Sequence, residues 1–323
     1  MPIYPGISSE AFRHPLDRQA EQALRSVPGF DLVASNFVQY FYERPQQVFL
    51  LGNNIRVSSR QYATVYGIFR ECLSVLDIAI EPTLYVSQNP VVNSYALGHE
   101  RPYIVVHSGL LDLLDEAEIR VVLAHELGHI KCDHTLLIQM AMWAMGAASL
   151  LGELTLGLGN VISSSLIYAF YEWRRKAELS ADRAAMLVID DLKTIFLTMM
   201  KMAGGSQRFG HECSLEEFMA QAESYENLDQ DGLNQLYKFL IYNGGNGGFL
   251  THPFPVERLS YLQSWADSKE YTRIKQGHYS RVAEEGSINV NNQPNNDEAE
   301  ALKRQIEALQ SQIDQLRSQS KEI

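Results

Sequence analysis

Five residues constrain this chain more than any others: His125-Glu126-Leu127-Gly128-His129. They end a run that begins with Asp115 and Glu118, whose three-residue spacing is typical of a capping box at the start of a helix. Apolar residues then recur at helical spacing from Ile119 to Leu123. The sequence therefore predicts one amphipathic helix that carries the whole motif.

Two histidines four residues apart lie on the same face of a helix, so His125 and His129 can present two imidazole nitrogens to one metal ion. This arrangement is typical of a zinc peptidase, in which Zn²⁺ takes a third protein ligand and keeps a fourth position open for water. Glu126, beside them, would take the proton from that water as it attacks a peptide carbonyl. A bare HExxH pattern also arises by chance, so the rest of the chain has to supply the other parts of the site.

In the long metzincin pattern, the third ligand is a histidine six residues after the second histidine of the motif. Six residues after His129 this chain has Thr135, so it does not follow that pattern. His134 misses the position by one residue and, by helical phase, points away from the motif, so we interpret it as a structural or surface histidine. Glu178 is the better candidate, with Asp182 four residues later on the same side of a predicted helix. Glu178 can complete a site of two histidines and one carboxylate, and Asp182 can accept the free N–H of a ligand histidine. A pair with this spacing is also common on a solvated helix face.

Short runs rich in β-branched and aromatic residues cover 83–87, 94–97 and 103–108, with turn residues between them. They predict a small antiparallel sheet that leads into the metal-binding helix, so we expect the last strand to lie close to the metal. An exposed strand edge there can bind an extended peptide as an added strand, although the sheet can equally be scaffold alone. With helical patterns on both sides, the chain is predicted to be a mostly helical α+β protein.

Three motifs follow one another along the chain: the HELGH motif, then Glu178-Leu179-Ser180-Ala181-Asp182, then Thr251-His252-Pro253 with Arg258. In this order they resemble the HtpX-like and CAAX prenyl protease family of zinc metallopeptidases, which are of gluzincin type. Asn93-Ser94-Tyr95-Ala96 is similar to that family's strand before the zinc helix. The resemblance covers about residues 80 to 262 and implies a zincin-like core with a small antiparallel sheet beside two zinc-bearing helices.

The resemblance also implies a role for each matching residue. One Zn²⁺ per chain would be bound by His125, His129 and Glu178, with Glu126 as general base and acid. The family's embedded members have long membrane-spanning helices, and we expect none at this N-terminus. Prenylated substrates and membrane-protein quality control are therefore not inferred.

Four further residues are implied around the metal. Asp182 would orient a ligand histidine. His252 would lie near the metal and stabilise the oxyanion of the tetrahedral intermediate, and Arg258 would support that segment by pairing with an acidic neighbour. Asn93, at the start of the strand motif, is the candidate substrate-binding residue.

The composition excludes some classes of partner. A net charge of −12 over 323 residues argues against nucleic acid as the main partner, because that would need a concentrated basic face. Cys72, Cys132 and Cys213 are few and widely spaced, which favours a reducing compartment over a disulfide framework. No basic segment followed by an apolar one opens the chain, so we predict no export signal and a cytoplasmic location.

Glu153 is the one charged residue between Thr135 and Tyr171. Each apolar half reaches the length at which a membrane span becomes a candidate. Polar residues and glycines interrupt both halves, so we favour buried helices, with a shallow membrane hairpin as the alternative.

The chain divides into four predicted parts: an N-terminal helical packing region (1–80), a metallopeptidase domain (81–283), a polar linker (284–297) and a C-terminal helix (298–323). Leu302, Ile306, Leu309, Ile313 and Leu316 form a heptad seam in the last part. This seam allows a homodimer through 298–320, or else a solvated helix. The glycine-rich segment 243–248 is either a lid over the site or a plain connector.

These observations favour a cytoplasmic zinc endopeptidase that acts on peptides or proteins. Two alternatives stay open at this point. One is a zinc-dependent scaffold or chaperone-like binder that holds peptides without cleaving them. The other is a membrane-associated quality-control protease that uses residues 135–171.

Overall fold

A computed structural model describes residues 2–27, 29–31, 34, 43–142, 164–229 and 255–282. The chain forms two compact units, which are described separately. Unit 1 contains Met1–Arg13, Glu43–Leu136 and Ala177–Ser287, and unit 2 contains the remainder. The four-part division of the chain stays a prediction, and the polar linker, the heptad seam and the glycine-rich segment lie outside the described residues.

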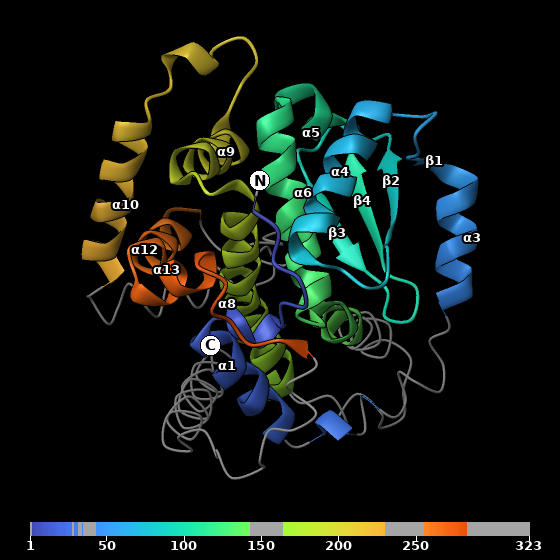
Figure 1. Ribbon diagram of the computed structural model, residues 1–323, viewed down its shortest axis with the longest axis horizontal. Coiled ribbons are helices and arrows are strands. Elements are labelled where there is room, and N and C mark those ends of the chain that lie inside the picture. The colour runs from blue at the N-terminus through green and yellow to red at the C-terminus, as the bar shows by residue number, and fades with distance from the viewer. Residues whose placement is uncertain are drawn as a thin grey trace, which may run out of the picture. The chain divides into compact units, whose positions relative to one another are not determined.

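Unit 1 contains one mixed sheet whose strand order is β1-β2-β4-β3 (Figure 1). Its strands are β1 (Ile55–Arg56), β2 (Thr83–Ser87), β3 (Ser94–Leu97) and β4 (Tyr103–His107). The bounds of the last three agree with the predicted runs, except that Ser108 begins a helix instead of ending a strand.

The prediction that this sheet is purely antiparallel is wrong, because β2 and β4 are parallel. The chain leaves β2, skips one strand position to form β3, and returns in β4 between them, so β4 runs in the same direction as β2. Gly98 makes this return possible with φ +89°, and a Cβ on it would lie 2.6 Å from the carbonyl oxygen of Arg101. The mostly helical α+β class is confirmed.

The rest of the described part of unit 1 is mostly helical. The two that matter most for the site are α6 (Glu116–Lys131) and α8 (Ser164–Ile189), whose residues from Ala177 onward belong to this unit. The others are η1 (Ser9–Ala11), α3 (Glu43–Asn53), α4 (Ala63–Leu76), α5 (Ser108–Leu113), α9 (Leu192–Gly204), η3 (Gly210–Glu212), α10 (Leu215–Asp229), α12 (Pro255–Ala266) and α13 (Lys269–Lys275).

The start of α6 is fixed by the predicted capping box. The Asp115 side chain accepts a hydrogen bond from the backbone N–H of Glu118 at 3.0 Å, and the Glu118 carboxylate accepts one from the backbone N–H of Asp115 at 2.9 Å. These bonds satisfy two backbone donors that a helix start otherwise leaves exposed. The helix ends at Lys131, and Asp133 then adopts a left-handed conformation with φ 56°.

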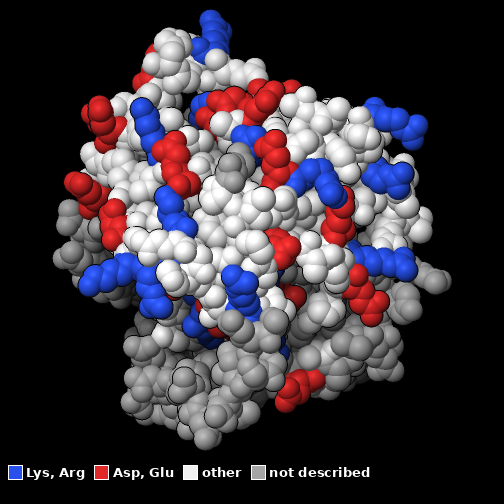
Figure 2. Space-filling model, in the orientation of Figure 1, with Lys and Arg blue, Asp and Glu red and all other residues white. Residues whose placement is uncertain are grey.

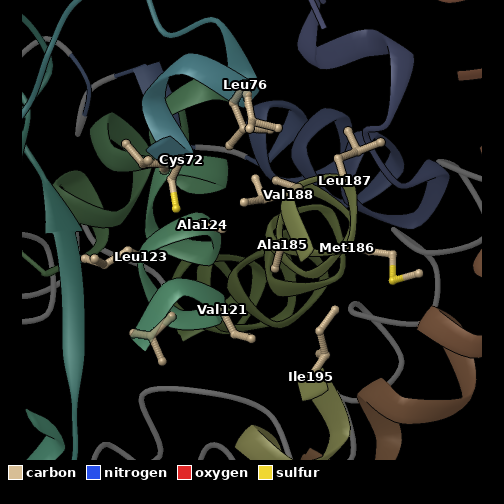
Figure 3. Close-up of a cluster of buried hydrophobic side chains, with 14 of the residues drawn as sticks. Cys72, Leu76, Val121, Leu123, Ala124, Ala185, Met186, Leu187, Val188 and Ile195 are labelled. Atoms are coloured by element: carbon tan, nitrogen blue, oxygen red, sulfur yellow. The ribbon is translucent and has the colours of Figure 1, made fainter. Parts of the chain in front are cut away.

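The core of unit 1 lies between one face of the sheet and the helices α4, α6 and α8. The strand registers place Leu84, Val86, Ala96, Ile104 and Val106 on that face, and all five are buried. Side chains of α4, α6 and α8 meet in the same cluster, with Cys72, Leu123 and Ala185 among them (Figure 3). Helix α4 packs on α6, and α6 runs along β3.

Unit 2 contains α1 (Pro15–Ser26) and the first part of α8. In it, the rings of Phe30 and Phe170 lie 6.1 Å apart. Among the described residues, no helix is both long enough and apolar enough to cross a membrane. Residues 143–163 lie outside the described part, so the prediction of buried helices over 135–171 stays untested there.

Charged side chains of both signs are interspersed on the face shown in Figure 2. On this face, lysine and arginine side chains do not gather into one continuous basic area.

Candidate metal centre

Helices α6 and α8 approach each other closely at Gly128, the fourth residue of the HELGH motif. A Cβ at this position would lie 2.7 Å from the Cβ of Ala184 and 2.9 Å from the Cα of Ala181. No side chain fits there, so the glycine and the small residues of α8 set the distance between the two helices. This contact brings the acidic residues of α8 to the histidine face of α6.

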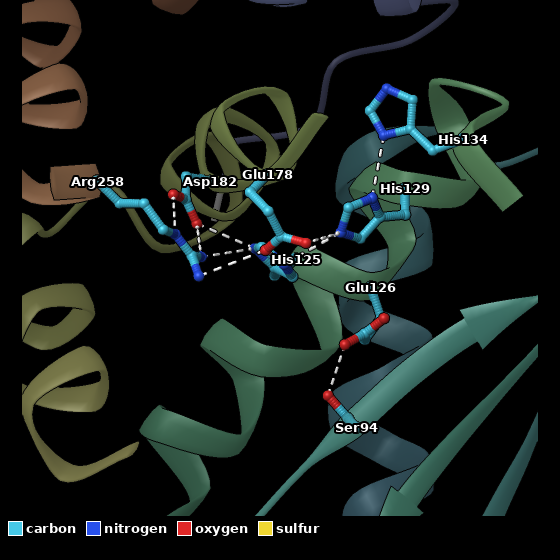
Figure 4. Close-up of polar contacts among 8 residues, drawn as sticks. All are labelled: Ser94, His125, Glu126, His129, His134, Glu178, Asp182 and Arg258. Atoms are coloured by element: carbon cyan, nitrogen blue, oxygen red, sulfur yellow. Dashed lines mark hydrogen bonds and ion pairs between the residues drawn. The ribbon is translucent and has the colours of Figure 1, made fainter. Parts of the chain in front are cut away.

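The three predicted ligands meet at this contact (Figure 4). Among the residues that the structure describes, His125, His129 and Glu178 form the one group of His, Cys, Asp or Glu side chains that could hold a metal ion. Nε2 of His125 lies 3.2 Å from Nε2 of His129 and 3.2 Å from Oε2 of Glu178. Nε2 of His129 lies 3.4 Å from Oε1 of Glu178.

These separations fit a tetrahedral metal ion. Two donors at about 2.0–2.1 Å from a tetrahedral Zn²⁺ lie about 3.3–3.4 Å apart. All three side chains are buried, and two imidazole lone pairs aimed at one carboxylate repel unless a proton or a cation lies between them. The donor set is therefore suited to a cation.

The His125 side of the site is held by an ionic chain of contacts. Nδ1 of His125 donates a hydrogen bond to Oδ1 of Asp182 at 3.0 Å. Arg258, from α12, forms a bidentate ion pair with Asp182, in which Nε donates to Oδ2 at 2.7 Å. Its Nη1 also lies 3.4 Å from Oε2 of Glu178. Arg258, which we expected to pair with an acidic neighbour, thus contacts both Asp182 and Glu178.

This chain of contacts shifts three pKa values. Burial alone lowers the pKa of His125, but hydrogen bonds to Asp182 and Glu178 raise it to about 9. Burial raises the pKa of Asp182, and the stronger combined effect of Arg258 and His125 lowers it below its ordinary value. Burial lowers the pKa of Arg258, and the neighbouring carboxylates raise it. The carboxylates that keep a proton on His125 would also favour a metal cation in its place.

The His129 side is held by another imidazole. Nδ1 of His129 lies 3.0 Å from Nδ1 of His134, which is fully buried. Burial, with His125 and His134 as neighbours, lowers the pKa of His129, and Glu178 opposes this only in part. If His129 binds the metal through Nε2, its Nδ1 carries the proton and donates a hydrogen bond to Nδ1 of His134.

His134 was predicted to be a structural or surface histidine, and the structure places it in the interior. The phase argument that pointed it away from the site assumes a continuous helix. The left-handed turn at Asp133 ends that helix and returns the chain to His129. Asp133, just after a helical run, is the sequence signal for such a turn, because aspartate tolerates the left-handed conformation better than most residues.

Glu126 is buried beside the donors and accepts a hydrogen bond from Oγ of Ser94 at 2.6 Å (Figure 4). Ser94 belongs to β3, the edge strand, and β3 is the strand that runs along α6. The expectation that the last strand lies close to the metal is therefore corrected, since β4 lies inside the sheet. The sequence reasoning missed Ser94, because strand alternation shows which face it occupies but not which helix packs there.

The predicted roles of two residues, Asn93 and His252, stay predictions. Asn93 precedes β3, and its carbonyl oxygen accepts the backbone N–H of His107 at 3.0 Å. Its side chain is half-buried. His252 lies outside the described residues.

Comparison with known proteins identifies a family whose sequence pattern covers the residues of this site. The sequence pattern of peptidase family M48 matches residues 59–266. The chain is 35% identical over 276 residues to the plastoglobule-localized metallopeptidase 48 (chloroplastic) of Arabidopsis thaliana. The aligned stretch covers 84% of this chain and 77% of that protein. It is 30% identical over 193 residues to the protease HtpX homolog of Dictyoglomus thermophilum, and this alignment covers 58% of this chain and 57% of that protein.

A third relative is the protease HtpX homolog 2 of Methanosarcina mazei, which is 26% identical over 252 residues, or 70% of this chain and 80% of that protein. No solved structure matches the chain. The family pattern and the Arabidopsis relative each cover most of the chain; the family is described as a peptidase family, and the relative is named as a metallopeptidase. The chain belongs to peptidase family M48, the HtpX-like metallopeptidases, and is a metal-dependent protease.

Proposed function

We propose that this chain is a zinc endopeptidase that holds one Zn²⁺ between His125, His129 and Glu178. The observation that carries the proposal is the close approach of the donor atoms: the two Nε2 atoms lie 3.2 Å apart, and each lies 3.2 or 3.4 Å from one carboxylate oxygen of Glu178. Two imidazoles and one carboxylate, with a fourth position open for water, are the ligand set of a catalytic zinc site.

The proposed roles divide between proton transfer and support. Bound zinc would polarise the substrate carbonyl and lower the pKa of a coordinated water. Glu126 takes the proton of the attacking water and delivers it to the leaving amine. Asp182, held by Arg258, fixes the His125 ring so that Nε2 faces His129 and Glu178. His252 is proposed to donate to the oxyanion.

The proposed substrate is an extended peptide that binds along β3. This strand is at an edge of the sheet, and no other described strand pairs with its outer side. Peptide backbone added to such an edge would be held straight next to Glu126. Asn93, at the start of β3, is proposed to contact the substrate. A peptide added along such an edge can extend on both sides of the scissile bond, as an endopeptidase requires.

The experiment that tests this function is the substitution Glu126→Gln. It removes the base and keeps the size of the side chain, so we expect kcat to fall by about 10²- to 10⁴-fold. Elemental analysis should find one zinc per chain in both forms, because Glu126 is not a ligand. The control is Glu116→Gln, an exposed glutamate on the same helix, which should cleave casein at the wild-type rate. Cleavage retained by Glu126→Gln, or full activity after complete removal of zinc, would contradict the proposal.

We also propose a cytoplasmic location and pairing through residues 298–320. The relative from Arabidopsis is named as plastoglobule-localized, so attachment to a lipid-associated fraction is the competing outcome. Fractionation without detergent separates the two, since recovery of the full chain with membranes or lipid particles contradicts the cytoplasmic location.

A further inference from the structure

Ser94 is a polar residue on an otherwise apolar face of the sheet. The register pairs Ser94 with Val106, which is itself paired with Val86, so the three side chains share one face. The other residues of that face in β2, β3 and β4 are aliphatic: Leu84, Val86, Ala96, Ile104 and Val106. Ser94 is only 2% exposed, so its hydroxyl has lost its contact with water. A hydroxyl in such a position needs a partner in the protein.

That partner is Glu126. Oγ of Ser94 lies 2.6 Å from Oε1 of Glu126, and Glu126 is also only 2% exposed. An ionised carboxylate can only accept, so the serine donates. The distance is in the range of charge-assisted O–H···O⁻ bonds, which are about twice as strong as neutral ones. One carboxylate oxygen is thereby fixed, and the other is left for the reacting water.

We propose that Ser94 is a positioning residue that holds Glu126 in the orientation needed for proton transfer. A carboxylate on a helix can rotate about its terminal bond, whose torsional preference is broad. The bond from Ser94 removes this freedom. It also ties the base to the edge strand β3, so the base keeps a fixed distance from a peptide on that strand. The inference rests on the proposed role of Glu126 as general base.

Three variants test this inference in the full-length, zinc-loaded protein with a fluorogenic peptide substrate. Ser94→Ala removes the donor, and Ser94→Cys replaces it by a weak donor of similar size. For both we expect kcat to fall about tenfold or more, with KM and zinc content unchanged. Ser94→Thr keeps the hydroxyl and should restore kcat to within about threefold of wild type. Ser87→Ala, in β2 of the same sheet, is the control and should leave kcat unchanged.

The results separate this inference from the proposed function. Wild-type kcat in Ser94→Ala or Ser94→Cys would overturn the role of Ser94, and the function would stand if Glu126→Gln is inactive in the same assay. Loss of zinc or of folding in both Ser94→Ala and Ser94→Cys would show a structural role and also overturn it. A folded, zinc-loaded Ser94→Thr that stays as slow as Ser94→Ala would count against it too. Cleavage by Glu126→Gln would instead contradict the proposed function.

Discussion

The two histidines of the HELGH motif stand four residues apart on one helix, yet they are held in different ways. His125 depends on Asp182 of α8 and Arg258 of α12, which are distant in sequence. His129 depends on His134, five residues later in the same segment. The pKa of His125 is raised to about 9, whereas the pKa of His129 is lowered.

The difference comes from the partner of each ring. A carboxylate stabilises the charged imidazolium, and a neutral imidazole does not. With both ligand histidines neutral, as metal binding requires, the formal charges of Asp182, Glu178 and Glu126 sum to −3, and Arg258 brings the buried group to −3 + 1 = −2. A divalent cation would neutralise this group. We call His125 with Asp182 and Arg258 the ionic side of the site, and His129 with His134 the neutral side. We expect the ionic side to supply affinity for the metal and the neutral side to supply orientation.

The largest effect is expected from Asp182→Asn, which breaks the ionic side. Arg258 is left without its bidentate partner, although it keeps the contact with Glu178 at 3.4 Å. Removing one partner of a buried ion pair costs about 3–5 kcal/mol, so we expect a loss of stability near the lower limit of that range. Zinc affinity should fall by about 10- to 100-fold, because the ring of His125 loses its charged acceptor and keeps at most a neutral amide oxygen.

Chemical denaturation and competition with a chromogenic chelator measure these two quantities. Asp267→Asn, an exposed aspartate on the turn after α12, is the matched control and should change neither. Wild-type zinc affinity in Asp182→Asn would show that the ionic side does not support the metal.

The sequence was informative where a local rule decides the structure. The capping box at Asp115 and the ranges of β2 and β3 follow from short-range spacing, and the structure reproduces them. The close contact at Gly128 and the pairing of Ser94 with Glu126 depend on which elements pack together. No periodicity reports this. The parallel pairing of β2 with β4 was missed for the same reason, since strand order is set by tertiary packing.

A smaller effect is expected from His134→Phe, which breaks the neutral side. Phenylalanine fills a similar volume but cannot accept the Nδ1–H of His129, so the ring loses its orienting partner. We expect zinc affinity to fall by about tenfold, the lower limit for a partner of a ligand histidine. The same chelator competition measures it, with His211→Phe, at an exposed histidine, as the control. A loss as large as that of Asp182→Asn would remove the distinction between the two sides.

The smallest effect is expected from Asp115→Ala, which weakens α6 without touching either side. Loss of an N-cap costs about 1 kcal/mol, and here it removes the acceptor for the N–H of Glu118. Lys201 still pairs with Glu118 at 2.6 Å, so the first turn keeps one of its anchors. The free energy of unfolding of the zinc-free protein should therefore fall by about 1 kcal/mol. The control is Asp112→Ala, at an exposed aspartate in α5, which should leave it unchanged.

Zinc affinity, in contrast, should not change in Asp115→Ala, because the cap lies two to three helical turns from the first ligand. The contacts of Gly128 with α8 hold that end of the helix independently of its start. A drop in zinc affinity would mean that the site depends on the whole length of α6. The ionic and neutral sides would then not be the separate supports that their contacts indicate.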